Sequence, residues 1–472
     1  MAVARKIAYN VLFNVITKVL STILALVGIG FITRYLGKDG FGDYSTVLAF
    51  FAFFGSVADL GIYSITAREI SRPGADEEKI LGNAFSIRIV ASLIILLTTP
   101  ALIYFLPYSH DIKYGIFLAA FSFVFSSTYM VLNGVFQKNL AMDKVALVEF
   151  IGKVIQTLII IFAVKKNLGF EIIILSILAS MVFNFTVITL LVRRFTTLRL
   201  KFDFAYWKKF LKESLPMGIS SIVVFVYFKM DTIMLSVMKT NTEVGIYNAA
   251  YKVIENVTFF PSMIMGLIFP ILSKHIFENR KHFTHISNET AKVFLILIVP
   301  ILIGTMFLSD GIIHLIGGAS FSQSAQTLRI LVFALVCIFF GGFFNNILIA
   351  ANKQKKLMYA LFFCSIFNIT ANFFIIPRYS YNGAAIVSFL TEALVVALSF
   401  YLTIKYTGYI PKINHFFRIL FSGTIMAFAM FLCGKNTPFL ITAFIGTASY
   451  GSSLWITGTV TIRELKSVFI SS

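Results

Sequence analysis

Amide and amine side chains recur every four residues in two strongly apolar stretches of the chain. They are Asn10, Asn14 and Lys18 in the first stretch, and Asn248, Lys252 and Asn256 in the second. Positions four apart lie on one face of an α-helix, so each stretch predicts a helix with one polar face. A face that stays polar through a membrane borders water, which predicts that both faces line one aqueous substrate-binding cavity.

Other ionisable residues also lie inside apolar stretches. A charge at the bilayer centre costs about 2.5–3.5 kcal/mol, so such residues must pair, snorkel or line water. We assign Arg88 to the cavity as well. Four acidic residues are candidates for ion coupling or gating, with helix–helix hydrogen bonding as the alternative role; they are Asp59, Asp231, Glu255 and Glu392.

The composition indicates that these residues sit in a membrane protein. The chain has 472 residues, of which 58% are hydrophobic and only 13% are charged. These values exclude a soluble globular domain and a disordered chain. The net charge of +19 is explained by basic cytoplasmic loops, so we expect no nucleic-acid partner.

Apolar runs of about 20 residues predict an all-α polytopic membrane protein with about fourteen transmembrane helices. The predicted spans are 10–35, 43–66, 83–106, 114–137, 145–164, 170–192, 215–238, 244–272, 290–316, 327–351, 357–376, 383–404, 415–433 and 438–460. Pro261 and Pro270 interrupt the eighth span, and Pro300 interrupts the ninth.

The distribution of basic residues predicts the orientation. With the N-terminus inside, the cytoplasmic segments carry 24 Lys and Arg residues and the outside segments carry seven. Cytoplasmic loops are enriched in these residues, so we predict both termini in the cytoplasm of a cell (inner or plasma) membrane. The first span is too long for a secretory signal and lacks a cleavage site.

The two sides of the chain echo each other. Phe41-Gly42-Asp43-Tyr44 follows the first span, and Val244-Gly245-Ile246-Tyr247 follows the seventh. This echo predicts two repeats, a transporter signature. The predicted domains are a six-helix bundle over 1–192, a basic cytoplasmic linker over 193–214, a second six-helix bundle over 215–404, and an additional helix pair with a cytoplasmic tail over 405–472.

Motifs for common catalytic and cofactor chemistry are missing from the sequence. It contains no G-x-x-x-x-G-K-[ST] phosphate loop. Its three cysteines lie in apolar runs without the spacing of a zinc site. We therefore expect no catalytic residues, no resident metal and no cofactor.

Several short motifs carry a family resemblance. The beginning of the chain holds Arg34–Gly37, Phe41–Tyr44 and Asp59–Gly61, and the second half holds Pro216, Asp231, Val244–Lys252, Pro270 and Asn382–Ala385. In this order they resemble the polysaccharide flippases of the multidrug/oligosaccharidyl-lipid/polysaccharide exporter superfamily. The resemblance covers nearly the whole chain.

The resemblance implies a V-shaped cavity between two six-helix bundles of the MATE (multidrug and toxic compound extrusion) type. It also implies translocation of an isoprenoid-diphosphate-linked oligosaccharide from the cytoplasmic to the outer leaflet by alternating access, for cell-surface glycan assembly. Lys18 and Lys252 would then bind the diphosphate head group. Implied partners are this substrate, membrane lipids, H+ or Na+, and glycan-assembly enzymes.

Other functions stay open at this point. A cation-coupled drug antiporter or a lipid II flippase would share the fold. A membrane glycan polymerase or ligase would need a sizeable external loop, and the outside loops here are short. A scaffold within a glycan-assembly complex would tolerate the loss of Lys18 and Lys252.

Overall fold

The structure is a computed structural model that describes residues 2–72, 74–434 and 437–459. These residues form α-helices and one 3-10 helix, with no strand among them. The described part of the chain contains twelve helices long and apolar enough to cross a membrane. The all-α polytopic fold is therefore confirmed. The predicted cytoplasmic tail lies mostly outside the described residues.

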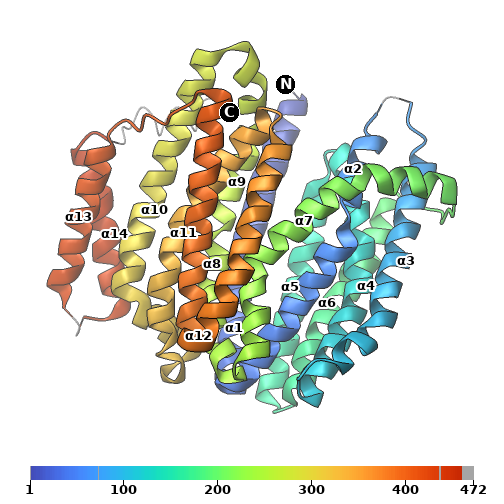
Figure 1. Ribbon diagram of the computed structural model, residues 1–472, viewed down its shortest axis with the longest axis horizontal. Helices are drawn as coiled ribbons and strands as arrows, with labels where there is room; N and C mark the ends of the chain where they lie inside the picture. Colours follow the sequence, from blue (N-terminus) through green and yellow to red (C-terminus); the bar gives the residue numbers. More distant parts are fainter. Residues whose placement is uncertain (1, 73, 435–436, 460–472) are drawn as a thin grey trace. The chain divides into compact units, whose positions relative to one another are not determined.

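The chain divides into two compact units, residues 1–245 and 246–472. The helices of unit 1 are α1 (Ala2–Asp59), α2 (Ile62–Ile70), α3 (Glu77–Tyr104), α4 (His110–Lys138), α5 (Met142–Lys165), α6 (Gly169–Val192) and α7 (Phe204–Met238) (Figure 1). Helix α8 (Asn241–Val257) straddles the boundary. Unit 2 continues with α9 (Phe259–Glu278), α10 (Arg280–Gly317), η1 (Ala319–Phe321), α11 (Ser324–Ala350), α12 (Gln354–Thr407), α13 (Phe416–Cys433) and α14 (Phe439–Ile456).

Two very long helices account for the difference between twelve helices and fourteen predicted spans. Helix α1 bends at Gly37, whose φ is 67°, and α12 bends at Ser380, whose φ is 51°. A straight helix of 58 residues would be about 87 Å long, nearly three times the thickness of the hydrocarbon core. Each bend falls between two predicted spans, so each long helix supplies two of them. The two arms of α1 run in opposite directions (Figure 1).

The prolines predicted to interrupt the eighth and ninth spans have different effects on the helices. A break at Thr258 separates α8 from α9 inside the predicted eighth span, three residues before Pro261. Proline lacks the amide hydrogen that would continue the helical hydrogen bonds, which accounts for a break at this place. Pro270 and Pro300 lie within α9 and α10.

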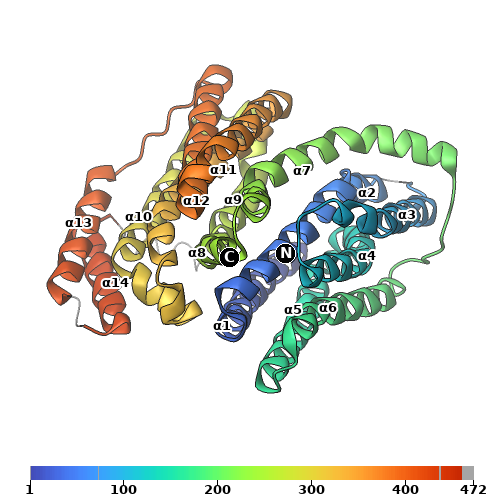
Figure 2. The same ribbon diagram turned by 60° about the horizontal axis from the view of Figure 1, so that its bottom comes forward.

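Helix α7 packs in unit 1 although the predicted second bundle began at residue 215. It contacts α1, α2 and α3, and its first half passes close to α2 and α3 (Figure 2). Residues 204–214 of the predicted linker form the beginning of this helix. The boundary between the compact units therefore falls one helix later than the boundary predicted between the bundles. The two-bundle repeat itself stays a prediction.

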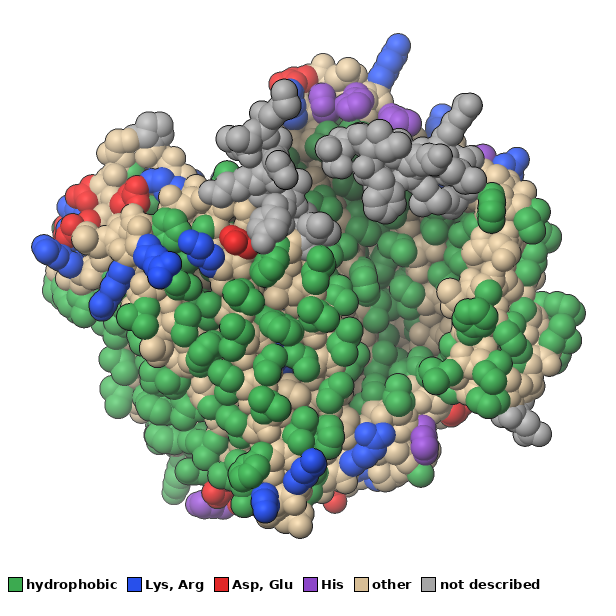
Figure 3. All heavy atoms as spheres, turned by 180° about the vertical axis from the view of Figure 1, so that it is seen from behind, with side chains coloured by type: hydrophobic (Ala, Val, Ile, Leu, Met, Phe, Trp, Pro, Cys, Tyr) green, Lys and Arg blue, Asp and Glu red, His purple; other side chains and the backbone are tan. Residues whose placement is uncertain are grey.

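The surface distribution of side chains is that of a membrane protein. On the face shown in Figure 3, hydrophobic side chains cover the middle of the helices, and charged side chains lie near the helix ends. Large apolar residues such as Leu97, Phe374 and Phe428 are exposed. Exposed apolar area of this extent is typical of helices solvated by lipid tails.

The two echoed glycines meet inside unit 1. A Cβ atom at Gly42 would overlap the carbonyl oxygen of Asn241, and a Cβ atom at Gly245 would overlap that of Lys38. Each glycine thus faces the residue four positions before the other glycine. This reciprocal contact is what a two-fold-related pair of repeats would produce, and it leaves no room for a side chain.

We expect Gly42→Ala and Gly245→Ala each to destabilise the protein by about 1–3 kcal/mol, because an extra methyl group forces the two backbones apart. Thermal unfolding in detergent measures the effect. Gly342→Ala is the matched control, since a Cβ atom there has no neighbour within 4 Å. Equal unfolding midpoints for all three variants would contradict the close approach.

Candidate functional site

The polar face of α1 begins with a structural contact. The side-chain amide of Asn10 donates to the carbonyl of Leu140 at 2.9 Å, and its oxygen accepts from the amide of Asp143 at 3.0 Å. Asn14 donates to the carbonyl of Asn10 at 2.7 Å. Asn10 therefore joins the beginning of α1 to the turn between α4 and α5, and Lys18 comes two helical turns later.

Lys18 lies at an exposed position on this face. Its charge is within electrostatic range of the carboxylate of Glu149 on α5, which packs against α1. One turn after Glu149, the amine of Lys153 donates to the side chain of Gln156 at 2.9 Å. The two helices thus bring amine, carboxylate and amide groups together, a set that can bind an anion while the carboxylate balances part of the positive charge.

The polar face of α8 contains an ion pair. The amine of Lys252 lies 2.6 Å from a carboxylate oxygen of Glu255, and the Lys252 side chain is 16% exposed. Asn256 donates to the Lys252 carbonyl at 2.7 Å, and Asn248 is buried. The structure therefore joins Lys252 to Glu255, which the sequence had assigned to ion coupling or gating.

Arg88 is surrounded by protein. It is 1% exposed and forms an ion pair with Asp59. It also donates to the carbonyl of Ala58 at 3.2 Å and to the hydroxyl of Ser127 at 3.3 Å. Arg88 and Asp59 were predicted for different roles, and the structure pairs them. These contacts hold the end of α1 against α3 and α4, which favours a structural role over direct contact with substrate.

The remaining acidic candidates are both buried. Asp231 of α7 is 2% exposed in unit 1, and Glu392 of α12 is 6% exposed in unit 2. Glu392 follows Thr391, whose hydroxyl accepts from the amide of Asn368 at 3.2 Å. Asn372 donates to Asn368 at 3.1 Å. We call Asn368, Asn372 and Thr391 the amide seam.

Sequence reasoning missed the amide seam. Asn368 and Asn372 are four residues apart in a predicted span and are fully buried, so the spacing used for the other two polar faces applies to them as well. Among the described residues, no group of three or more His, Cys, Asp or Glu side chains is placed to hold a metal ion.

Comparison with known proteins decides the family. The model of a family described as "Polysaccharide biosynthesis protein" matches residues 7–276, more than half of the chain. This chain belongs to the polysaccharide biosynthesis protein family. A second model, that of the MatE family, matches residues 216–374.

Several proteins resemble this polysaccharide biosynthesis protein over most of its length. A probable low-salt glycan biosynthesis flippase from Haloferax volcanii is 22% identical over 94% of this chain and 93% of its own. A lipid II flippase in an inward closed conformation has a TM-score of 0.75 and 19% identity, covering 96% of this chain and 99% of its own. An inward-facing multidrug resistance transporter of the MATE family has a TM-score of 0.68 and 13% identity, covering 84% and 99%.

These findings confirm the resemblance stated from the motifs. The two solved structures share the fold of this multi-pass membrane protein. None of the matches tests individual residues, so the assignments of Lys18, Lys252 and the acidic candidates stay predictions. The structure adds which of these residues pair with one another.

We expect Arg88→Met to destabilise the protein by about 3–5 kcal/mol, because it leaves Asp59 without its buried cation. Thermal unfolding in detergent measures this loss of stability. Lys18→Met is the matched control, because it removes an exposed cation, and we expect it to change the unfolding midpoint little. If Arg88→Met unfolded like the wild type yet lost transport, the guanidinium would belong to the substrate-binding face instead.

Proposed function

We propose that this chain moves an isoprenoid-diphosphate-linked oligosaccharide from the cytoplasmic to the outer leaflet of the cell membrane by alternating access. The observation that supports this proposal most is that the chain belongs to the polysaccharide biosynthesis protein family and is similar, over nearly its whole length, to a protein named as a glycan biosynthesis flippase. The product would supply glycan-assembly enzymes on the outer side. In this proposal the chain is a transporter that catalyses no bond-making step.

The substrate head group would bind the two polar helix faces. A diphosphate carries several negative charges, which amine and amide donors bind best in a partly desolvated place. Lys18 with Asn14 on α1, and Lys252 with Asn248 and Asn256 on α8, offer such donors. Arg88 contributes indirectly in this proposal, by fixing the helices around Asp59.

Glu255 would lower the affinity of the polar face of α8 for the head group. In the structure its carboxylate pairs with Lys252, so a bound phosphate has to compete with it for the amine. This competition would keep affinity moderate, which suits a protein that must release its cargo in the other leaflet. Conversion of Glu255 to Gln removes the competitor and should tighten binding of the head group.

Glu392 is the proposed group for coupling to H+ or Na+. Its support is the burial of the Glu392 side chain, which is 6% exposed, because a buried acid either binds a proton or needs a compensating partner. Asp59 is a weaker candidate, since Arg88 already balances its charge. Asp231 is buried as well and is the second choice.

The proposed orientation puts both termini in the cytoplasm. The charge bias between alternate loops supports it. The turns that join α2 to α3, α4 to α5 and α6 to α7 would then lie on the cytoplasmic side. A flippase with this orientation would receive its substrate from the leaflet where lipid-linked sugars are assembled from soluble precursors.

A cation-coupled drug antiporter is the second candidate. It is favoured by the MatE model match over residues 216–374 and by the fold shared with a multidrug transporter. That function predicts that acidic residues dominate the polar faces, whereas the recurring side chains of these stripes are amines and amides. Unchanged glycan handling together with increased drug sensitivity in depleted cells would favour this candidate.

The proposed function predicts where lipid-linked glycans accumulate. In cells depleted of the protein, we expect intermediates to stay where a membrane-impermeant glycan-modifying probe cannot reach them. Lys18→Ala and Lys252→Ala should restore at most about a tenth of the access given by the wild type, since a charged hydrogen bond is worth about 1.5–3 kcal/mol. Lys355→Ala, at an exposed position in the first turn of α12, should restore access fully.

Two outcomes of this assay would overturn the proposal. If intermediates reach the outer leaflet normally but stay unpolymerised, the protein acts after translocation, as an enzyme or scaffold. If Lys18→Ala and Lys252→Ala behave like Lys355→Ala, the cationic faces have no role in binding the substrate.

Ion coupling gives a separate prediction. Glu392→Gln preserves the shape and polarity of the side chain but cannot exchange a proton or balance a cation. We expect it to abolish the dependence of transport on a Na+ or pH gradient in proteoliposomes while substrate binding persists. A gradient dependence equal to that of the wild type would exclude Glu392 as the coupling group.

A further inference from the structure

Residues 193–213, which we call the basic segment, are fixed to unit 1 on one side. The side-chain oxygen of Asn83 on α3 accepts from the amide of Asp203 and from the indole of Trp207, both at 2.9 Å. Phe210 is buried in the core cluster formed with α2–α6. A Cβ atom at Gly82 would overlap the Arg199 carbonyl. The inner side of the segment is therefore built into the protein.

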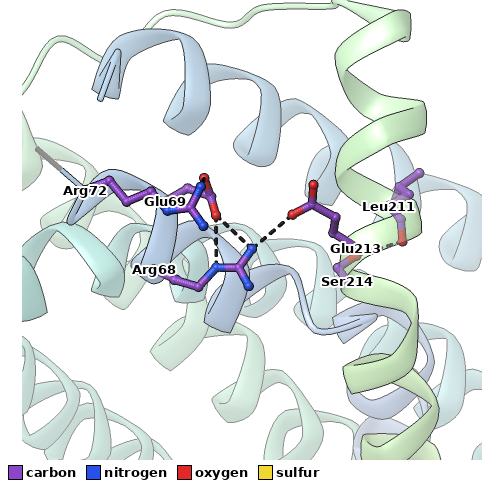
Figure 4. A network of polar contacts seen from close by, with 6 residues as sticks. All are labelled: Arg68, Glu69, Arg72, Leu211, Glu213 and Ser214. Carbon is purple, nitrogen blue, oxygen red and sulfur yellow. Dashed lines mark hydrogen bonds and ion pairs between the residues drawn. The ribbon is translucent and has the colours of Figure 1, made fainter. Parts of the chain in front are cut away.

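Both acidic residues of the basic segment are engaged by cations from neighbouring helices. Asp203 lies 3.1 Å from the amine of Lys79 on α3. Glu213 lies 3.0 Å from the guanidinium of Arg68 on α2, and Figure 4 shows this second pair. The Tyr206 amide and Lys79 hold the pKa of the Asp203 carboxyl below its usual range. These acids therefore do little to neutralise the cations on the outer side of the segment.

The outer side of the basic segment carries six exposed cations. They are Arg193, Arg194, Arg199, Lys208, Lys209 and Lys212. Phe204, Lys208 and Lys212 are spaced four residues apart and lie on one face at the beginning of α7, and Lys209 directly follows Lys208. The outer side is thus strongly positive and continuous from the end of α6 into α7.

Exposed aromatic side chains stand among these cations. Phe204 is 72% exposed and Phe202 is 55% exposed. Their ring centroids lie 5.2 Å and 5.8 Å from that of Trp207. Rings beside Lys and Arg are typical of segments that lie in the lipid head-group region. The apolar span Met217–Met238 begins five residues after Lys212, about 7 Å along the helix, which puts the cations at head-group depth.

We propose that the outer side of the basic segment binds the head groups of anionic phospholipids, with Phe202 and Phe204 inserted at the boundary of the acyl chains. The charge complementarity favours this occupant, since each basic residue near an anionic leaflet gains attraction that falls off within a Debye length. The nearness of the hydrocarbon span favours a lipid surface over a soluble acidic protein. This interaction is independent of the cargo of the transporter.

Trp207 is a built-in probe for this interaction. The chain has two tryptophans, so Trp455→Phe leaves Trp207 as the sole indole. The protein is reconstituted in bilayers of phosphatidylcholine and phosphatidylglycerol in fixed proportion, with brominated chains on one lipid at a time. We expect several-fold stronger quenching of Trp207 by brominated phosphatidylglycerol than by brominated phosphatidylcholine, and a loss of this preference at high salt.

Two variants separate charge from aromatic insertion. Joint replacement of Lys208, Lys209 and Lys212 by Gln should lower the preference for the anionic lipid several-fold. Phe204→Ser should lower quenching by both lipids. The matched control replaces Lys281, Lys355 and Lys356 by Gln, which removes the same charge from exposed positions in the first turns of α10 and α12 in unit 2 and should leave the preference unchanged.

Each contrary result overturns the proposal. Absence of quenching by either lipid would mean that the segment does not reach the bilayer. Equal quenching by both lipids in the wild type would mean that head-group charge is not recognised. An equal loss of preference in the two triple variants would assign the effect to net charge rather than to the basic segment.

Discussion

The cost of a polar group in hydrocarbon governs this structure. Each such group must be paired, hydrogen-bonded or in contact with water. Arg88 meets the requirement through Asp59, and the amide seam meets it through side-chain hydrogen bonds within unit 2. Lys18 lies at an exposed position of a spanning helix, with the carboxylate of Glu149 within electrostatic range. A charged amine at such a position is stable where water or an anion reaches it. This requirement is the physical basis for assigning substrate binding to the α1 face.

The same constraint explains what the sequence could predict. Runs of apolar residues locate spans because hydration of the backbone is impossible in lipid, and all fourteen predicted spans fall on helices of the structure. Helical spacing also predicts the polar faces around Lys18 and Lys252. The bends at Gly37 and Ser380, by contrast, depend on single residues with non-helical backbone angles between neighbouring spans, which hydropathy does not register. The packing of α7 within unit 1 depends on contacts across distant segments.

The spacing of residues along the sequence could not predict which side chains pair between helices. Positions along one helix say nothing about a partner 29 residues away, so Arg88 and Asp59 received separate roles. The echo between Phe41–Tyr44 and Val244–Tyr247 was visible in the sequence, but only the structure brings Gly42 and Gly245 within backbone contact. Residues 193–214 were predicted to form a basic cytoplasmic linker. In the structure its inner side is anchored by Asn83, which leaves a defined outer side for the lipids.

The account depends most on Lys18 and Lys252 facing a water-filled, substrate-binding path. The direct measurement is the reaction of Lys18→Cys and Lys252→Cys with a membrane-impermeant thiol reagent, in a protein whose three native cysteines are replaced. Leu97→Cys, at an exposed apolar position of α3, reports the lipid-facing surface. We predict that positions 18 and 252 react and that added polyprenyl-diphosphate oligosaccharide slows the reaction, while position 97 stays unreactive. Failure of positions 18 and 252 to react, as at position 97, would contradict the account.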